Sequence, residues 1–405
     1  MRPLVRLACV ALFALVSACA QKAAPPPPPP VAQAKPAPVP AKPSPAVPAK
    51  PAAPAVPQVA PPGSTIVGVV LPLSGPSAAI GNAMLNAAQM ALFELASPDL
   101  TLLPFDSAGT AEGAEAAVRQ ATAQHADIIV GPLFAAEARA ATPVAEAARV
   151  PLLSLSADQS VAGHGTYVMG FLPGPQALRA AQYAASQGKM RQAILAPSNE
   201  YGRRVVAAVT NGLAGSGVTV GPVEYYDPSG LDLSGPLKRL LVHRQGDDAG
   251  FDALLLPDDG QRLRRAGEQW AAQGVPSDRV ALLGTMLWDD ARPGEIPSLV
   301  GGWYAVASSA GFADFAKRYA KAFNAQPPRL ASLAYDATAI AAVLGKRSAH
   351  DFSPGILTNP QGFAGVDGLF RLNIDGTNTR AYAVKEVVPN GQPKEVAPAA
   401  KSFEG

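Results

Sequence analysis

The stretch of sequence that decides the fold runs from Ala126 to Ala157 and reads ADIIVGPLFAAEARAATPVAEAARVPLLSLSA. Near its two ends lie short, mainly apolar runs, ADIIVGPL at 126–133 and PLLSLSA at 151–157, of the kind that form buried strands. The alanine-rich segment between them has the composition of a helix. A buried strand, a helix and a second buried strand predict two parallel strands joined by a crossover helix, because such a sheet is covered on both faces.

The same alternation extends outward from this unit in both directions. Apolar runs at 65–73 and 100–107 precede it, and a second series begins with runs at 191–198, 217–226, 251–258 and 279–286. Helical segments separate these runs, two consecutive helices follow near 312–345, and a hairpin is expected around Asp375 and Gly376. The pattern predicts an α/β protein with two doubly wound lobes and a chain that passes between them several times.

The amino terminus has the composition of a targeting signal. Arg2 and Arg6 precede an apolar run, 7–16, that is too short to span a bilayer, and small residues lead to Cys19. The residues VSAC at 16–19 resemble the bacterial lipobox, which implies removal of residues 1–18 and lipid attachment to Cys19. A plain secretory signal is the alternative. Since Ala20 follows the cysteine, the resemblance implies the periplasmic face of a Gram-negative outer membrane.

The segment 19–63 is rich in proline and alanine and has no repeating apolar face. It cannot pack a core, so we predict a disordered tether behind the lipid anchor. Polyproline II rises ~3.1 Å per residue, and roughly forty residues therefore reach on the order of 100 Å.

Composition excludes several classes of function. Of the two cysteines, Cys9 lies in the leader, so the mature chain has no pair for a disulfide or a zinc ribbon. The net charge is +2 and no basic run alternates with aromatic residues, which argues against a nucleic-acid partner. The four histidines are scattered, and no nucleophile elbow or Walker A motif is present. We therefore predict a protein that is not an enzyme and holds no cofactor or metal.

Several longer phrases resemble a known family and appear in that family's order. They are GVVLPLSGPSAAIGNAMLNAAQMALFE at 68–94, the stretch at 128–158, NEYGRRVV at 199–206 and GVDGLFRLNIDG at 365–376. Residues 64–388 are similar to the type I periplasmic binding proteins of the leucine/isoleucine/valine-binding group. The resemblance implies two lobes joined by three crossovers. It places lobe 1 in 64–172 plus 308–365, lobe 2 in 173–307 plus 366–390, and a flexible tail in 391–405.

Ligands of open α/β sheets bind beyond the carboxyl ends of the strands. This rule and the family's receptor pattern select cleft candidates on the loops after each strand, namely Ser74, Ala135, Ser154, Ser156, Asp158, Tyr201, Asp258, Met286 and Trp288. The match to an amino-acid receptor is incomplete. Tyr201 agrees with it, but Ala135 lacks a hydroxyl, Met286 replaces the usual acid, and the Asp158 carboxylate is expected to repel a ligand carboxylate.

Two functions remain open. The segments 71–95 and 152–173 look closest to lipoprotein activators of penicillin-binding proteins, which implies that the partner is a bifunctional peptidoglycan synthase in the inner membrane. The long tether suits that role. The alternative is a substrate-binding lipoprotein that delivers an amino acid or a similar small polar ligand to an ABC permease.

Overall fold

The computed structural model describes residues 63–95, 99–348 and 350–403, which belong to one compact unit. The signal peptide, Cys19 and the tether up to residue 62 lie outside the described residues, and their predicted roles stay predictions. Within the described part of the chain, every helix is too short or too polar to cross a membrane.

Lobe 1 is built on a five-stranded sheet with the order β2-β1-β3-β4-β5. All neighbouring strands are parallel, and Ile129 lies opposite Leu152, as the strand–helix–strand reading of 126–157 predicts. The strands are β1 (Thr65–Leu71), β2 (Leu100–Asp106), β3 (Ile128–Val130), β4 (Leu152–Ser154) and β5 (Thr166–Val168).

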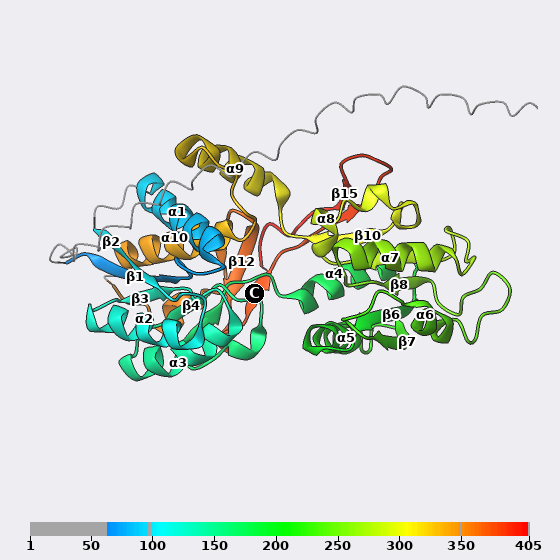
Figure 1. Ribbon diagram of the computed structural model, residues 1–405, viewed down its shortest axis with the longest axis horizontal. Helices are drawn as coiled ribbons and strands as arrows, with labels where there is room; N and C mark the ends of the chain where they lie inside the picture. The colour runs from blue at the N-terminus through cyan, green and yellow to red at the C-terminus, as the bar shows by residue number, and fades with distance from the viewer. Residues whose placement is uncertain (1–62, 96–98, 349, 404–405) are drawn as a thin grey trace, which may run out of the picture. The chain divides into compact units, whose positions relative to one another are not determined.

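Helices cover both faces of this sheet (Figure 1). Along β1, Val69 packs in the same cluster as Met84 and Ala337, whereas Val70 packs with Ala117 and Ala141. Alternate side chains of one strand therefore bury themselves under different helices, which is why the strand is apolar throughout. The helices of this lobe are α1 (Ala78–Glu94), α2 (Ala111–Ala123), α3 (Ala135–Ala148), η1 (Gln159–Val161), α9 (Ser309–Phe323), α10 (Ala331–Arg347) and α11 (Pro354–Leu357).

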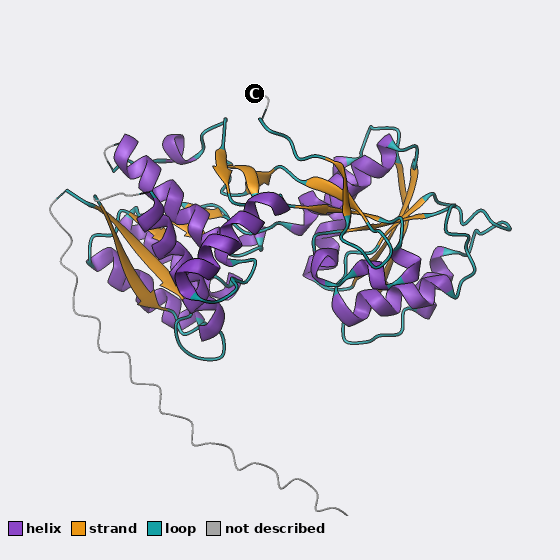
Figure 2. Cartoon of the chain, turned by 90° about the horizontal axis from the view of Figure 1, so that it is seen from above, coloured by secondary structure: helices purple, strands orange, loops and turns teal. Residues whose placement is uncertain are grey.

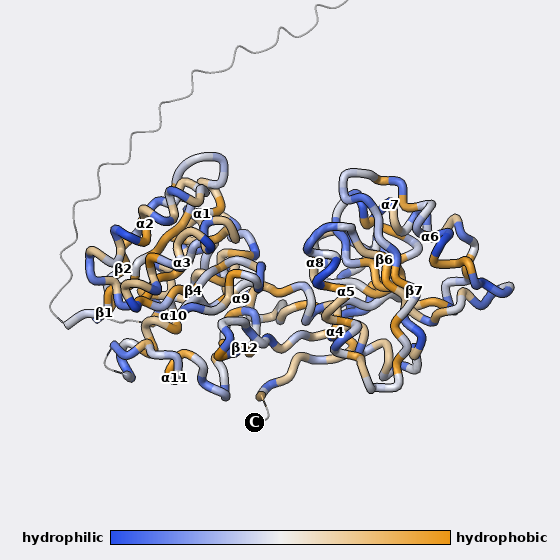
Figure 3. Tube along the Cα trace, turned by 90° about the horizontal axis from the view of Figure 1, so that it is seen from below, coloured by the Kyte–Doolittle hydropathy of each residue, from blue (hydrophilic) through white to orange (hydrophobic). Residues whose placement is uncertain are grey.

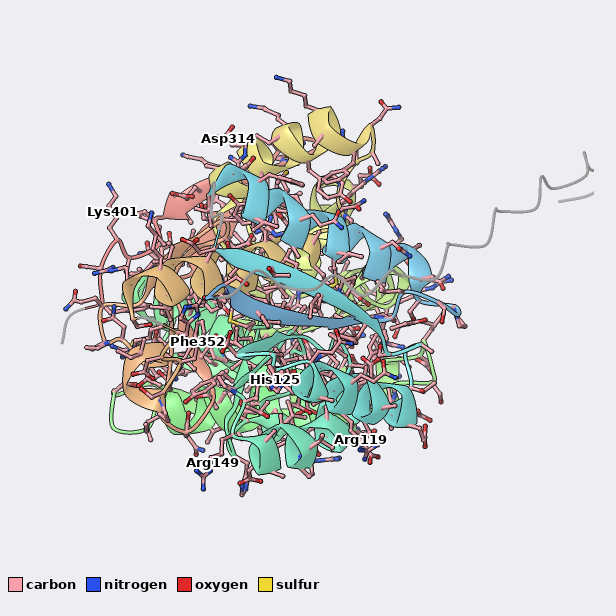
Figure 4. All side chains as sticks on the ribbon, turned by 90° about the vertical axis from the view of Figure 1, so that its left-hand side faces the viewer. Arg119, His125, Arg149, Asp314, Phe352 and Lys401 are labelled. Atoms are coloured by element: carbon pink, nitrogen blue, oxygen red, sulfur yellow. The ribbon has the colours of Figure 1, made fainter. Side chains whose placement is uncertain are left out.

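The surface of lobe 1 is charged and its interior is apolar. Arg119 and Arg149 project outward from the ends of α2 and α3, and Asp314 projects from α9 (Figure 4). Phe352, in contrast, is 5% exposed and belongs to the main core.

Lobe 2 is built on a seven-stranded sheet with the order β15-β14-β10-β9-β8-β6-β7. Five strands are parallel, and the last two strands of the chain add to one edge in antiparallel fashion. The tube is strongly hydrophobic along β6, in the middle of the lobe (Figure 3). The strands are β6 (Arg191–Pro197), β7 (Thr219–Tyr226), β8 (Ala253–Leu255), β9 (Ala281–Gly284), β10 (Trp303–Val306), β14 (Ala383–Glu386) and β15 (Lys394–Ala397).

Helices pack against this sheet as well, so that each large sheet lies among helices (Figure 2). They are α4 (Pro173–Ser186), α5 (Glu200–Gly212), α6 (Ser234–Leu240), α7 (Gly260–Ala271), α8 (Leu287–Asp290), η2 (Pro293–Glu295) and η3 (Pro297–Leu299).

Two helices begin unusually close to the strand that precedes them. A Cβ added to Gly81, in α1, would lie 2.0 Å from the carbonyl oxygen of Pro72. A Cβ added to Gly202, in α5, would lie 1.9 Å from the carbonyl oxygen of Pro197. Only glycine permits this approach, which brings the first turn of each helix against the carboxyl end of its strand.

A third, three-stranded antiparallel sheet consists of β11 (Phe363–Gly365), β12 (Gly368–Leu372) and β13 (Asn378–Arg380). The hairpin expected around Asp375 and Gly376 is confirmed as the β12–β13 pair. The boundary predicted between residues 365 and 366 falls inside this sheet, where Gly365 lies opposite Gly368, and the third crossover to lobe 2 comes only after β13, at 381–382. The predicted flexible tail contains β15, an exposed edge strand whose polar sequence shows no apolar pattern.

The chain crosses between the lobes three times, at 169–172, 307–308 and 381–382, which confirms the predicted fold class. Two arginines hold the first two crossovers, namely Arg380 of β13, which is buried, and Arg329 before α10, which is partly buried. Arg380 donates from Nη2 to the Met169 carbonyl at 3.2 Å, and its guanidinium lies over the Phe171 and Phe370 rings. Arg329 donates from Nη2 to the Ser308 carbonyl at 3.2 Å.

Two buried carboxyl groups, Asp367 and Asp336, lie close to these arginines. Asp367 forms an ion pair with Arg329 at 2.5 Å and accepts the Ser332 hydroxyl. Asp336 accepts the backbone N–H of Val366 at 2.8 Å. Burial, together with the nearby Asp367 charge, raises the pKa of Asp336 to about 7 in spite of that hydrogen bond and of Arg380.

Candidate ligand-binding cleft

A cavity of about 650 Å³ lies between the lobes at the carboxyl ends of their strands. Lobe 1 contributes the loops that follow β3, β4 and β5 and the residues before α10. Lobe 2 contributes the first turns of α4 and α5 and the loop after β9. The strand-end rule therefore locates the cleft correctly.

The lining is mainly apolar. Its larger apolar side chains are Leu133, Phe134, Leu155, Phe171, Met286, Leu287 and Leu330. Its polar and charged side chains are Ser156, Asp158, Gln176, Glu200, Tyr201, Arg204, Thr285 and Arg329.

Five of the nine cleft candidates line this cavity, namely Ala135, Ser156, Asp158, Tyr201 and Met286. They come from both lobes and from four different segments of the chain. Ala135 begins α3 and contributes only a methyl group. Met286 is held by Gln176, whose side-chain oxygen accepts its backbone N–H at 3.0 Å.

The other four candidates do not line this cavity. Ser74 is exposed on the loop after β1, and Ser154 is fully buried. Asp258 accepts hydrogen bonds from the Tyr226 hydroxyl and from Arg262 beneath the lobe 2 surface, where burial raises its pKa. Trp288 turns into the core of lobe 2 and donates from Nε1 to the Leu256 carbonyl at 3.0 Å.

Trp288 points inward because a glycine opposite it leaves room for the ring. A Cβ added to Gly284 would overlap the indole, and the ring also packs against Tyr304 at a centroid distance of 6.0 Å. The position of Trp288 after a strand does not reveal its contacts with Gly284 and Tyr304, which determine where the ring points.

A chain of ion pairs crosses the cleft. Asp158 of lobe 1 accepts from Arg204 of lobe 2, and its second oxygen accepts from Arg139 at 2.8 Å. Arg204 also donates from Nε to Glu200 at 3.0 Å. The Asp158 and Arg204 side chains are only 22% and 19% exposed, so this pair is shielded from solvent more than an ordinary surface pair.

These contacts change what Asp158 does in the cleft. Burial alone would raise its pKa, but hydrogen bonds from Ser160 and Arg204 outweigh burial and lower the pKa to about 2. The carboxylate is therefore charged but compensated by two arginines. It does not act as the free negative charge that the sequence analysis expected to repel a ligand.

Two buried hydroxyls on the lobe 2 wall have no hydrogen-bond partner of good geometry within the described residues. They belong to Tyr201, in the first turn of α5, and Thr285, which follows β9. Burial raises the pKa of Tyr201 strongly, although the Thr285 hydroxyl nearby opposes the shift. Tyr201 is therefore a neutral hydrogen-bond donor and acceptor at any ordinary pH.

Sequence reasoning missed several lining residues. Arg204 lies one helical turn after Tyr201, so the spacing alone placed it on the same face of α5. Thr285 directly precedes the predicted Met286. Arg329 reaches the cleft from the start of α10, and no motif in its neighbourhood indicates that contact.

No group of three or more His, Cys, Asp or Glu side chains in the described ranges is arranged to hold a metal ion. The cleft offers a ligand apolar contact, three hydroxyl-bearing side chains (Ser156, Tyr201 and Thr285) and the charged groups of the ion pairs.

Comparison with known proteins places this geometry in a family. The sequence model of the family described as "Periplasmic binding protein" matches residues 65–392. An uncharacterised protein of Rickettsia prowazekii is 22% identical over 201 residues, which is 49% of this chain, and the chain spans about half of that relative's length, 54%.

Solved structures share the fold. A leucine-binding protein, LivK, from Thermotoga maritima superposes with a TM-score of 0.59 at 20% identity and covers 82% of this chain and 98% of its own. The solute-binding protein of an ABC transporter from Rhodopseudomonas palustris, in complex with 3,4-dihydroxybenzoic acid, superposes with a TM-score of 0.61 at 17% identity and covers 84% and 98%. The family match extends over nearly all of the described chain, and both lobes and the three crossovers lie within it. The chain belongs to the periplasmic binding protein family.

Proposed function

We propose that this protein is a non-enzymatic binding protein that takes a small, mainly apolar molecule into the cleft between its lobes. The observation that carries the proposal is the cleft itself. Its volume of about 650 Å³ suits a small organic molecule, its lining is mainly apolar, and Tyr201 and Thr285 place two hydroxyl-bearing side chains in its lobe 2 wall. A hydroxyl in the wall can turn to donate to or accept from a ligand's polar group, which adds direction to the apolar contact.

A free α-amino acid is the less favoured ligand. Its ammonium group needs a carboxylate, yet Met286 lies where an acid is expected, and Glu200 is engaged by Arg203 and Arg204. Ala135 offers no hydroxyl to the ligand's carboxylate. Solute-binding proteins of the same fold from Rhodopseudomonas palustris hold benzoate and 3,4-dihydroxybenzoic acid, which makes aromatic acids the first probes to use.

Calorimetric titration of the full chain with benzoate, benzyl alcohol and L-leucine tests this proposal. We expect one or both aromatic probes to bind more tightly than leucine. Tyr201→Phe should weaken that binding about three- to tenfold, since one net hydrogen bond contributes roughly 1 kcal/mol. Tyr225→Phe, which removes a hydroxyl from a half-exposed ring on β7 outside the cleft, is the matched control and should change nothing. Absence of binding for all three probes at millimolar concentration would refute the proposal.

Activation of a peptidoglycan synthase is the second candidate, and one observation favours it. Asp158 and Arg204 join the two lobes directly, so the lobes have an attractive contact of their own that needs no ligand. A protein held in this way can act through its outer surface. In this role the lipid on Cys19 would anchor it at the periplasmic face of the outer membrane, and the tether would let it reach the synthase.

The two candidates separate experimentally. Glycan polymerisation by a purified bifunctional synthase should accelerate when the protein is added if it is an activator. An unchanged rate, together with tight binding of an aromatic probe, would leave the receptor role and direct attention to an ABC permease as the partner.

A further inference from the structure

Five charged side chains form a continuous network that crosses the cleft from lobe 1 to lobe 2. Three are arginines, Arg139, Arg203 and Arg204, and two are carboxylates, Asp158 and Glu200. The network therefore carries one positive charge more than its carboxylates compensate. A single additional anion would balance it.

Arg204 is the member of the network that a ligand in the cleft can reach. It lines the cavity, and it donates from Nη1 to Asp158 and from Nε to Glu200. Its Nη2 has no partner among the residues that the structure describes. A carboxylate prefers to bind an arginine through two parallel hydrogen bonds, and the Nη1 and Nη2 edge offers such a pair once Asp158 moves aside.

Asp158 can leave Arg204 without becoming an unpaired charge. Its carboxylate also accepts from Arg139 at 2.8 Å, from the backbone N–H of Ser160 at 2.8 Å and from the Ser160 hydroxyl at 2.7 Å. Glu200 likewise keeps Arg203 at 3.1 Å. After the exchange each carboxylate of the network still has an arginine, and Arg204 is left for the ligand.

We infer that the Asp158 carboxylate occupies on Arg204 the place of a ligand carboxylate, so that the ligand is an apolar monocarboxylate and Asp158 is its intramolecular competitor. The inference rests on the proposed function, because it takes the cleft to be a small-molecule site. The apolar part of the ligand packs against Phe134, Phe171 and Met286, which line the same cavity. A second charged group on the ligand would have no free counter-charge in this network.

The test compares benzoate with benzyl alcohol, a neutral molecule with the same ring, by calorimetry on the full chain. Asp158→Asn removes the competing charge and should tighten benzoate binding about tenfold, while benzyl alcohol changes less than about twofold. Arg204→Gln should weaken benzoate binding at least tenfold more than it weakens benzyl alcohol binding, because any opening of the lobes affects both probes and only benzoate loses the charge contact.

Two control variants repeat these charge changes far from the network. Asp314→Asn on the exposed face of α9 matches Asp158→Asn, and Arg265→Gln on α7 matches Arg204→Gln. Neither should alter benzoate binding. Thermal melts check folding, and Asp158→Ser, which keeps an oxygen to cap the turn at η1, replaces the asparagine variant if that variant is unstable.

Each outcome is decisive. Benzoate binding that weakens or stays the same in Asp158→Asn overturns the inference, and if benzyl alcohol still binds the wild-type chain, the proposed function survives. Benzoate binding that appears only in Asp158→Asn supports the inference in its strongest form. If wild type and Asp158→Asn bind neither probe, the proposed function fails and the inference fails with it.

Discussion

At the scale of single residues, Asp336 makes the most definite prediction. Its carboxyl is buried, and its pKa is raised to about 7 from an ordinary value of 3.8. The native state therefore holds this proton more tightly than the unfolded chain does. The resulting stabilisation is complete below about pH 4 and is lost as the pH rises through 7.

We expect the free energy of unfolding, measured with urea, to fall by on the order of 2–4 kcal/mol from this group between pH 4 and pH 8. Asp336→Asn should remove most of that slope, because an amide keeps the hydrogen bond from Val366 but does not ionise. Asp314→Asn, an exposed carboxylate on α9, serves as the control and should keep the wild-type slope. Equal slopes in all three proteins would show that Asp336 does not carry the pH dependence.

The sequence predicts which residues lie at strand ends, but it does not predict whether their side chains point into the cleft or into the core. Ala135, Ser156, Asp158, Tyr201 and Met286 line the cavity because they lie on strand-end loops or on the helix starts that follow them. Trp288 lies at such an end too, but packing against Gly284 and Tyr304 turns it away. Contacts between residues far apart in sequence, such as Arg204 with Asp158, could not be predicted from either position alone.

At the scale of elements, the approach of α5 to β6 makes a prediction that runs against helix propensity. Alanine normally stabilises a helix relative to glycine by up to about 1 kcal/mol. At Gly202 the added Cβ would lie 1.9 Å from the Pro197 carbonyl oxygen, so the helix would have to move. We expect Gly202→Ala to lower the urea unfolding free energy by about 1–3 kcal/mol.

Gly355 in α11 is the matched control, because a Cβ there would meet no atom within 4 Å. Gly355→Ala should be neutral or slightly stabilising. Since Tyr201 and Arg204 lie on the same first turns of α5 as Gly202, the Gly202 variant should also bind the aromatic probes less tightly. A Gly202 variant as stable as wild type would mean that α5 shifts without cost.

The elements themselves were largely predictable, and the reason is burial. β1, β3, β4 and β8 are covered on both faces, so their sequences are continuous apolar runs that stand out. β15 is an exposed edge strand with the sequence KEVA, which is not a continuous apolar run, so its sequence does not predict a strand. Its pairing with β14 follows from where the chain returns to the sheet, which local sequence does not encode.

At the scale of the whole molecule, the Asp158–Arg204 pair predicts how the ligand-free lobes are held. Because the pair links lobe 1 to lobe 2, breaking it should favour a more open arrangement. We expect Arg204→Gln to show a larger radius of gyration than wild type in small-angle X-ray scattering without ligand. Arg265→Gln should match wild type. If the Arg204 variant is no larger, the ion pair does not hold the lobes together.

Any opening of the two lobes changes the backbone conformation of the three crossovers that join them. Arg380 holds the Met169 carbonyl, Arg329 holds the Ser308 carbonyl, and Asn378 holds the carbonyls of Val168 and Gly170. Each residue has only two soft dihedral angles, and these hydrogen bonds fix several peptide planes on the lobe 1 side. The crossovers are therefore restrained on the lobe 1 side, and their backbone has little freedom there. Arg329 also lines the cleft. A ligand that contacts its guanidinium therefore acts directly on a group that holds the second crossover in place.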